Sequence, residues 1–330
     1  MFTHSGKTVA LGLLSAATFF HAPLFAQSVK TQIQFAQATV GIAANSFTDK
    51  IYVAAPSYGG ATDTLSVIDG KSDTISANIT VPRGAQLPVV DLLRNTVFVV
   101  GCDFYSTNFN CIVTKVDGKT NKVINTETVT TTEGDGIIGA AYDPICEKLY
   151  LANGSNFRID VIDGRDLKVV DAISTNGQEP FGISLNPLNH RLYVPYYSNQ
   201  VQVFDTYTKA LLDTATFGSQ DVATAVNWFT GNVFVSDNVF GPSTEGVLDK
   251  NGVVLATPSV SETPYNLDVD LLTNKAYVLS TGIPALNVID GKTNTVTATL
   301  QGINASYISV DFFSHKVYIS GNSGVTVVTE

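Results

Sequence analysis

Short apolar runs separated by polar turns follow one another along the chain in a repeated order. Each unit begins with an apolar run that ends at an Asn or Asp, and a turn then leads to a strongly apolar run such as residues 148–152. A third run, such as residues 286–290, is joined by a tight turn to a fourth, such as residues 295–300. The runs are short, and helical periodicity is absent, so the pattern predicts four β-strands per unit, called a, b, c and d in chain order.

A fixed interval identifies the turn between strands a and b. An aromatic residue stands seven positions after the Asn or Asp in every unit, whereas successive aromatic residues are 46, 52, 43, 41, 43 and 41 residues apart. The pairs are Asn45/Tyr52, Asp91/Phe98, Asp143/Tyr150, Asn186/Tyr193, Asn227/Phe234, Asp270/Tyr277 and Asp311/Tyr318. A constant inner interval and a variable outer one indicate a rigid corner on units that are joined by loops of variable length.

Four short strands in about 43 residues is the repeat of a β-propeller blade. The last unit has only three strands, at residues 306–310, 316–320 and 324–329, while a strand at residues 29–36 precedes the first unit. We expect this N-terminal strand to complete the last blade, because the ring then closes without an open sheet edge. The predicted fold is therefore all-β, a single seven-bladed β-propeller of four-stranded antiparallel blades over residues 27–330.

The turn between strands c and d often begins with Asp-Gly. Four units have this dipeptide, at Asp69-Gly70, Asp117-Gly118, Asp163-Gly164 and Asp290-Gly291. Asp-Gly between apolar runs is a strong hairpin signal, and we expect its glycine to adopt the positive φ that such turns require.

Three stretches resemble the YVTN repeat, which defines a family of exported seven-bladed propellers that includes surface-layer proteins and YncE-like periplasmic proteins. Two of them begin Asp-Gly-Lys-Thr-Asn, at residues 117–123 and 290–296, and the third covers residues 179–187 with 191–194. The resemblance extends over residues 31–330 and implies a propeller outside the cytoplasm with a binding or structural role. It implies no catalytic residues that map onto this chain.

The N-terminus has the pattern of a cleaved signal peptide. Lys7 is followed by an apolar stretch at residues 9–20 and by a cleavage region that ends at Ala26. The stretch is short for a membrane span, no Cys follows it as a lipid attachment point, and no later run is long enough to cross a bilayer. We therefore expect residues 1–26 to be removed and the mature protein to be periplasmic or secreted.

The charge of the chain argues against nucleic acid as a partner. The 330 residues include 19 basic and 29 acidic side chains, for a net charge of −10, and only 15% are charged. Removal of residues 1–26 takes away one Lys and no acid, which leaves 18 against 29 and a net charge of −11. An acidic surface repels phosphate backbones and anionic lipid. We expect a monomer that binds protein or glycan.

The cysteines suggest one disulfide. Cys102 ends a predicted strand b and Cys111 begins the following strand c, so a bond between them would pin the two ends of one hairpin in an exported protein. Closing a loop of this size stabilises by roughly 2–3 kcal/mol on the chain-entropy model. Cys146 lies in the a–b turn of the next unit and is expected to be free.

Side chains with catalytic or metal-binding chemistry are sparse. His190 and His315 both stand three residues before the aromatic residue of their units, where Asp49, Glu147 and Asn274 occur in others, so we expect turn residues rather than ligands. No sequence pattern of a metalloprotease, a phosphate loop or a calcium loop is present, and we predict neither a metal nor a cofactor. The alternative is a lyase or hydrolase, similar to the streptogramin lyases, that uses carboxylates at the channel mouth.

The candidate binding residues come from the d–a and b–c loops, which share one face of a propeller. They are Arg83, Gln86, Glu133, Asp135, Glu179, Phe181, Asp221, Tyr265, Asp268, Tyr307, Tyr196 and Tyr197. Asp268 differs most from the repeat, because the other units have Ala, Val or Ser at its position in strand a. It is either a ligand contact or a solvated channel carboxylate. Tyr196 and Tyr197 belong to a set of loop aromatics that, if exposed, would suit a partner, and that would otherwise pack over the blade edges.

Overall fold

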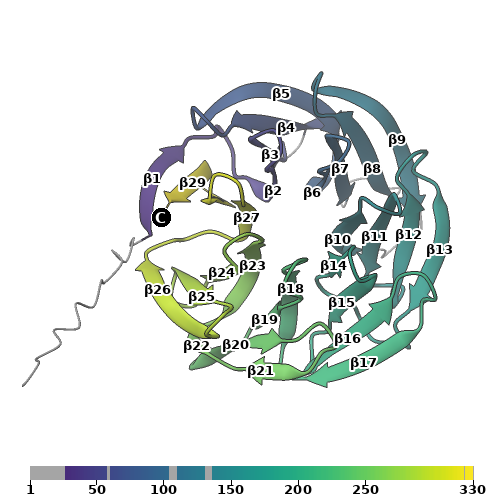
Figure 1. Cartoon of the computed structure of the whole chain (residues 1–330). Helices are drawn as coiled ribbons and strands as arrows, with labels where there is room; N and C mark the ends of the chain where they lie inside the picture. Colours follow the sequence, from purple (N-terminus) through teal and green to yellow (C-terminus); the bar gives the residue numbers. More distant parts are fainter. Residues whose placement is uncertain (1–26, 58–59, 104–109, 131–135, 323, 330) are drawn as a thin grey trace, which may run out of the picture.

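A computed structural model shows a ring of seven β-sheets around a central channel (Figure 1). It describes residues 27–57, 60–103, 110–130, 136–322 and 324–329. These residues form 29 strands and no helix. The seven-bladed β-propeller predicted from the sequence is confirmed.

Each blade is an antiparallel sheet whose strands are ordered from the channel to the rim. Blades one to four consist of β2 (Val40–Asn45), β3 (Lys50–Ala55), β4 (Thr62–Asp69), β5 (Thr74–Pro82); β6 (Ala85–Asp91), β7 (Thr96–Cys102), β8 (Cys111–Asp117), β9 (Lys122–Thr130); β10 (Ile137–Asp143), β11 (Lys148–Asn153), β12 (Arg158–Asp163), β13 (Val169–Ser174); and β14 (Ser184–Asn186), β15 (Arg191–Pro195), β16 (Gln200–Asp205), β17 (Leu211–Thr216). Blades five to seven consist of β18 (Asp221–Val226), β19 (Val233–Asp237), β20 (Ser243–Leu248), β21 (Val254–Ala256), β22 (Ser259–Val260); β23 (Pro264–Asp270), β24 (Lys275–Ser280), β25 (Ala285–Asp290), β26 (Thr295–Gln301); and β27 (Tyr307–Asp311), β28 (Lys316–Gly321), β29 (Gly324–Thr329), β1 (Ser28–Ile33).

The N-terminal strand closes the ring, as predicted. β1 pairs antiparallel with β29, and the register runs from Ser28 opposite Thr329 to Ile33 opposite Val325. The last blade is therefore built from both ends of the propeller domain (Figure 1). The strand ends at Ile33 rather than at residue 36.

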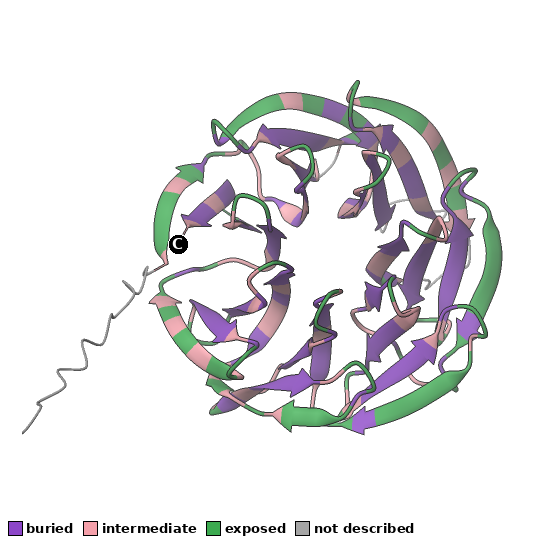
Figure 2. Cartoon of the chain, in the orientation of Figure 1, coloured by how far each residue is buried: buried purple, intermediate pink, exposed green. Residues whose placement is uncertain are grey.

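The core is divided among the interfaces between blades. Seven clusters of buried apolar side chains lie between neighbouring blades. The aromatic residues of the repeated interval lie in these clusters and are almost fully buried. Figure 2 shows the resulting gradient, with buried inner strands and exposed outer strands. Because each blade buries its faces only against its neighbours, a complete ring is the condition for a complete core.

The a–b corner has the same chemistry in every blade. The Asn or Asp that starts the interval accepts a hydrogen bond from the backbone N–H two residues later, as in Phe47 N to Asn45 Oδ1 at 3.1 Å. The residue three positions before the aromatic has positive φ in all seven blades: Asp49, Asn95, Glu147, His190, Gly231, Asn274 and His315. Asn, Asp, His and Gly tolerate this left-handed conformation better than branched residues do. This requirement explains why these residue types share the position.

The same Asn or Asp also connects neighbouring blades. Asn45 Nδ2 donates to Asn95 Oδ1 at 2.9 Å. Asp270 Oδ2 lies 2.6 Å from Nδ1 of His315 in the same way. The repeated interval therefore marks a turn cap that, at Asn45 and Asp270, also joins one blade to the next.

The expected role of the Asp-Gly glycines is wrong. Gly70, Gly118, Gly164 and Gly291 do not have positive φ; residues three positions later do, including Asp73 and Asn294. The glycines are needed for space instead, because a Cβ on Gly70 would lie 3.0 Å from the carbonyl oxygen of Asp49 and closer still to its carboxylate. Gly70 N donates to that carbonyl at 2.8 Å, so the c–d turn packs directly against the a–b corner.

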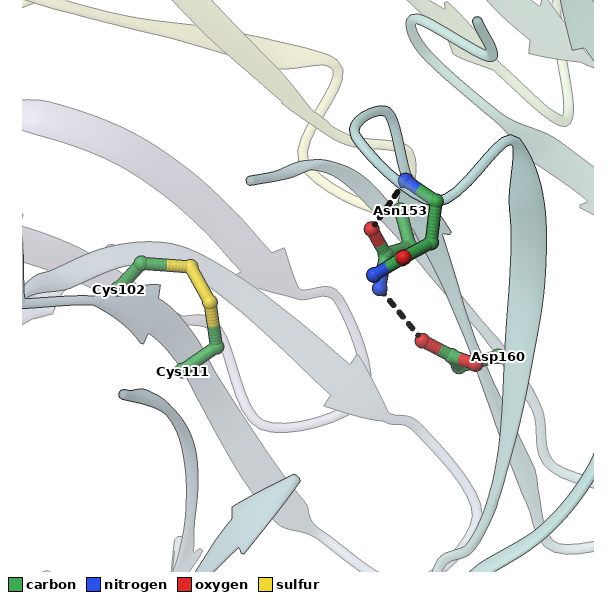
Figure 3. Close-up of a disulfide and its surroundings, with 5 residues drawn as sticks. Cys102, Cys111, Asn153 and Asp160 are labelled. Carbon is green, nitrogen blue, oxygen red and sulfur yellow. Dashed lines mark hydrogen bonds between the residues drawn. A yellow bond between two sulfur atoms is a disulfide. The ribbon is translucent and has the colours of Figure 1, made fainter. Parts of the chain in front are cut away.

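The disulfide is confirmed. Cys102 and Cys111 are paired across the ends of β7 and β8, with their Cα atoms 3.9 Å apart (Figure 3). Both are buried. In the adjacent blade Asn153 Nδ2 donates to Asp160 Oδ2 at 2.9 Å (Figure 3), so a buried polar contact fixes the b–c end of that blade. Cys146 is free.

Candidate functional site

A cavity opens on the face formed by the d–a and b–c loops. Its volume is about 350 Å³, and it lies where blades seven, one and two meet. Three of the predicted residues, Arg83, Gln86 and Tyr307, line it. They come from the loop before β6, from β6 and from β27, and these two inner strands flank β2 in the ring.

The wall of this cavity is held by two carboxylates, the buried Asp63 and the partly exposed Asp103. Asp63 Oδ2 accepts hydrogen bonds from Gly84 N at 2.7 Å and Ala85 N at 3.1 Å, and its Oδ1 accepts one from Ser57 N at 2.8 Å. Arg83 pairs with Asp103, with its Nε 2.9 Å from each carboxylate oxygen. The loops are therefore positioned before any ligand arrives, which lowers the entropic cost of binding.

A second cavity of about 340 Å³ forms the channel mouth beside the first. Gln86 and Tyr307 line both cavities, and Phe181 and Tyr265 line the second. The ring of Phe181 stacks on Tyr197, with centroids 5.7 Å apart. The structure thus brings five of the predicted residues to the channel mouth and its rim, and Arg83 to the cavity beside it.

Asp268 lies deeper, in the channel below the mouth. It pairs with Tyr277 across the blade, as Ser309 pairs with Tyr318, which confirms its equivalence to the small residues of other blades. Its Oδ1 accepts from Val269 N and its Oδ2 from Val310 N of the next blade, both at 2.8 Å. Burial raises its pKa to about 6, against the opposing effect of these hydrogen bonds. No other carboxylate is among the described residues that line this part of the channel.

The remaining predicted residues lie elsewhere. Glu179 is exposed on the d–a loop. Glu133 and Asp135 are outside the residues that the structure describes. Of the two alternatives for Tyr196, the structure has the packed one: the residue is 2% exposed, and its hydroxyl donates to Gln202 Oε1 at 2.7 Å. Its backbone pairs with Pro180 and continues the sheet, so its side chain enters the blade interface while that of Tyr197 points outwards.

Asp221 is buried rather than part of the channel mouth. It starts β18 opposite Asp237, and neither of its carboxylate oxygens has a hydrogen-bond partner. Burial, and next the charge of Asp237, raise its pKa to about 9. Glu245 on β20 is also buried, and burial raises its pKa well above its ordinary value. These three acids form a cluster inside blade five that the sequence did not reveal.

The opposite face carries a ring of apolar side chains. The residue two positions after the repeated Asn or Asp is a large hydrophobic in every blade, and all seven are at least half exposed: Phe47, Leu93, Ile145, Leu188, Phe229, Leu272 and Phe313. Phe47 and Phe313 stack with centroids 5.5 Å apart. The fixed offset from the Asn or Asp was the signal in the sequence that could have identified this ring.

Comparisons with known proteins do not name a family for this chain. No family model matches the sequence, and no curated protein matches it either. The resemblance to the YVTN repeat therefore remains a prediction. Within the described residues, none forms a helix of the length and apolarity needed to cross a membrane.

Proposed function

We propose that this protein is an exported binding propeller that holds its partner on the face of the d–a and b–c loops. The observation that carries the proposal is the pair of adjoining cavities that share Gln86 and Tyr307. Their combined opening is rimmed by Phe181, Tyr197 and Tyr265. Concave sites with aromatic walls and a few polar groups are the usual form of a binding site.

The lining favours an uncharged partner surface with amide and hydroxyl groups. Gln86 and Tyr307 bring polar groups to the lining, and the carboxylates of Asp63 and Asp103 are engaged by backbone N–H groups and by Arg83. Aromatic faces beside such groups suit an extended peptide or a glycan chain. The proposed export and the YVTN-type family are consistent with a partner in the cell envelope or outside the cell.

A double variant tests this site. Tyr265→Ala with Tyr307→Ala removes two aromatic walls but none of the aromatics of the repeated interval, and we expect at least about tenfold weaker binding of the peptide or glycan selected by wild-type protein on arrays. Tyr307 also packs against the core between blades seven and one, so circular dichroism of the variant checks that the fold is intact. Isothermal titration of that ligand measures the change. Phe229→Ala, which truncates an exposed aromatic on the opposite face, is the control and should bind as wild type. Equal affinities of all three proteins would disprove the assignment of this face.

The apolar ring supports a second candidate, a scaffold that assembles face to face with a second copy of the chain. The seven side chains are regularly spaced and lie on one face, and a ring presented by two copies is self-complementary about a two-fold axis. On this second candidate, wild type is a dimer, and Phe229→Ser with Phe313→Ser shifts it to a monomer in sedimentation equilibrium. A wild-type protein that stays monomeric at high concentration, as the sequence leads us to expect, would exclude this role.

A further inference from the structure

Three side chains of different donor chemistry meet between blades three and four. One carboxylate oxygen of Asp143, the Sγ of Cys146 and a ring nitrogen of His190 all lie within 4.8 Å of one another. Asp143 ends β10, Cys146 follows in the same a–b turn, and His190 comes from the a–b turn of the next blade. We propose that these residues form a binding site for a divalent first-row transition metal, best suited to zinc.

The first support is that polar atoms at this place are buried without partners. Asp143 is 0% exposed, and its Oδ2 has no hydrogen-bond partner; Nδ1 of His190 is also buried and has none. A buried polar atom without a partner costs about 1–3 kcal/mol. A cation shared by the carboxylate and the imidazole would remove both penalties at once.

The second support comes from the equivalent pair elsewhere in the ring. Asp270 and His315 occupy the same positions in blades six and seven, and there the carboxylate and Nδ1 lie 2.6 Å apart in a direct hydrogen bond. Between blades three and four that bond is replaced by an open arrangement with a thiol beside it. The turn geometry is the same, since His190 and His315 have φ of 58° and 55°. The difference between the two pairs therefore does not come from the φ of the histidine.

The donor set selects the metal. Thiolate, imidazole and carboxylate are zinc ligands, whereas calcium and magnesium prefer oxygen ligands alone. Three protein ligands leave a fourth tetrahedral position for water or for the hydroxyl of Tyr207, which accepts a hydrogen bond from Cys146 Sγ at 3.4 Å. Ligand atoms in a tetrahedral zinc site stand roughly 3.3–3.8 Å apart. A contraction of the observed cluster by about 1 Å would complete the geometry.

The surroundings already orient the ligands. Asp143 Oδ1 accepts hydrogen bonds from Ile145 N at 2.8 Å and Cys146 N at 2.9 Å, so the carboxylate is held in place and its Oδ2 is left without a protein partner. The ring of Tyr207 packs on that of His190 with centroids 4.4 Å apart. Such supporting contacts contribute to metal affinity by fixing the ligand orientation. Cys146 and His190 are partly exposed, which gives a metal a path from the face of the a–b turns.

The experiment uses the oxidised full-length mature protein, treated with a chelator and titrated with zinc and with cobalt(II). We expect one zinc per chain by calorimetry, and a thiolate-to-cobalt charge-transfer absorption from Cys146, the one free thiol. Cys146→Ser and His190→Asn should each weaken zinc binding at least about tenfold, and Cys146→Ser should abolish the charge-transfer band. Both replacements suit the turn, because Ser314 and Asn274 hold the equivalent positions in other blades.

His315→Asn is the matched control and should bind zinc as wild type does. Should Cys146→Ser not fold, protection of the wild-type thiol from alkylation by zinc measures the same contact. The proposal is overturned if wild type shows no charge-transfer absorption and no thiol protection, or if zinc binds both ligand variants as tightly as wild type.

Discussion

Replacement of Asp73 by alanine is expected to destabilise the propeller by about 3 kcal/mol, because this carboxylate joins the first blade to the last. Asp73 lies in the c–d turn of blade one, and Lys316 Nζ lies 3.0 Å from its Oδ1. Tyr318 also donates to Oδ1 at 3.1 Å, and Lys30 of the N-terminal strand pairs with Oδ2 at 2.6 Å. The Lys316 side chain is 12% exposed, so loss of Asp73 leaves a nearly buried ammonium group without its carboxylate partner. Chemical denaturation measures the change.

Two controls separate the ion cluster from other effects. Asn294→Ala makes the same truncation in the equivalent turn of blade six, where φ is also positive, and should cost only the left-handed backbone strain of about 1 kcal/mol. Lys30→Ala removes the more exposed ion pair and should cost less than about 1 kcal/mol. Equal losses for Asp73→Ala and Asn294→Ala would show that the cluster adds nothing to closure.

The same cluster predicts a dependence on pH. Burial alone would raise the pKa of Asp73, but hydrogen bonds from Lys30 and Lys316 outweigh it and hold the pKa below its ordinary value of 3.8. A lowered pKa gives stability that is present above 3.8 and is lost as the pH falls through the folded-state value. The difference between wild type and Asp73→Asn should therefore disappear in acid.

The ring was predictable because its repeated unit is specified by local chemistry. The interval from Asn45 to Tyr52 recurs without change, since a capped turn of fixed length and a buried aromatic are needed at every blade interface. The closure of the ring was also predictable, because the last blade lacked one strand and an unassigned strand preceded the first blade. The cluster around Asp73 was not predictable, because it joins residues that are more than 240 positions apart.

Individual side-chain environments were predicted less well. Tyr196 and Tyr197 are adjacent aromatics in one loop, and only the continuation of the sheet through Pro180 decides which of them is buried. The sequence predicted that Asp221 is a loop residue on the channel face, whereas it is the first residue of β18 and its side chain is buried in the blade. The exact lining of the channel mouth was not predictable, because it depends on which loops approach one another. Repeat spacing alone does not specify those approaches.

Replacement of Asp221 by asparagine is expected to stabilise the protein at neutral pH. Both carboxylate oxygens of Asp221 are buried without partners near Asp237 and Glu245, and its pKa is raised to about 9. Because the pKa of Asp221 is raised on folding, its contribution to the free energy of unfolding is fully present below the ordinary pKa of 3.8. That contribution is lost as the pH rises through about 9. At pH 7 the unfolded chain releases this proton while the folded one retains it, a cost on the order of 2–4 kcal/mol.

The variant and wild type should therefore be similarly stable near pH 4 and diverge up to about pH 9, with the variant more stable. Denaturation at a series of pH values measures the divergence. Asp213→Asn removes one exposed charge from the neighbouring blade and controls for the reduced net negative charge of the chain. The three acids lie on adjacent strands β18, β19 and β20, so Glu245→Gln should also stabilise the protein. The two gains should not add, because Asp221→Asn and Glu245→Gln both relieve the same repulsion among these carboxyl groups. A stability gain that does not vary with pH would contradict a proton held by Asp221 and would indicate improved packing instead.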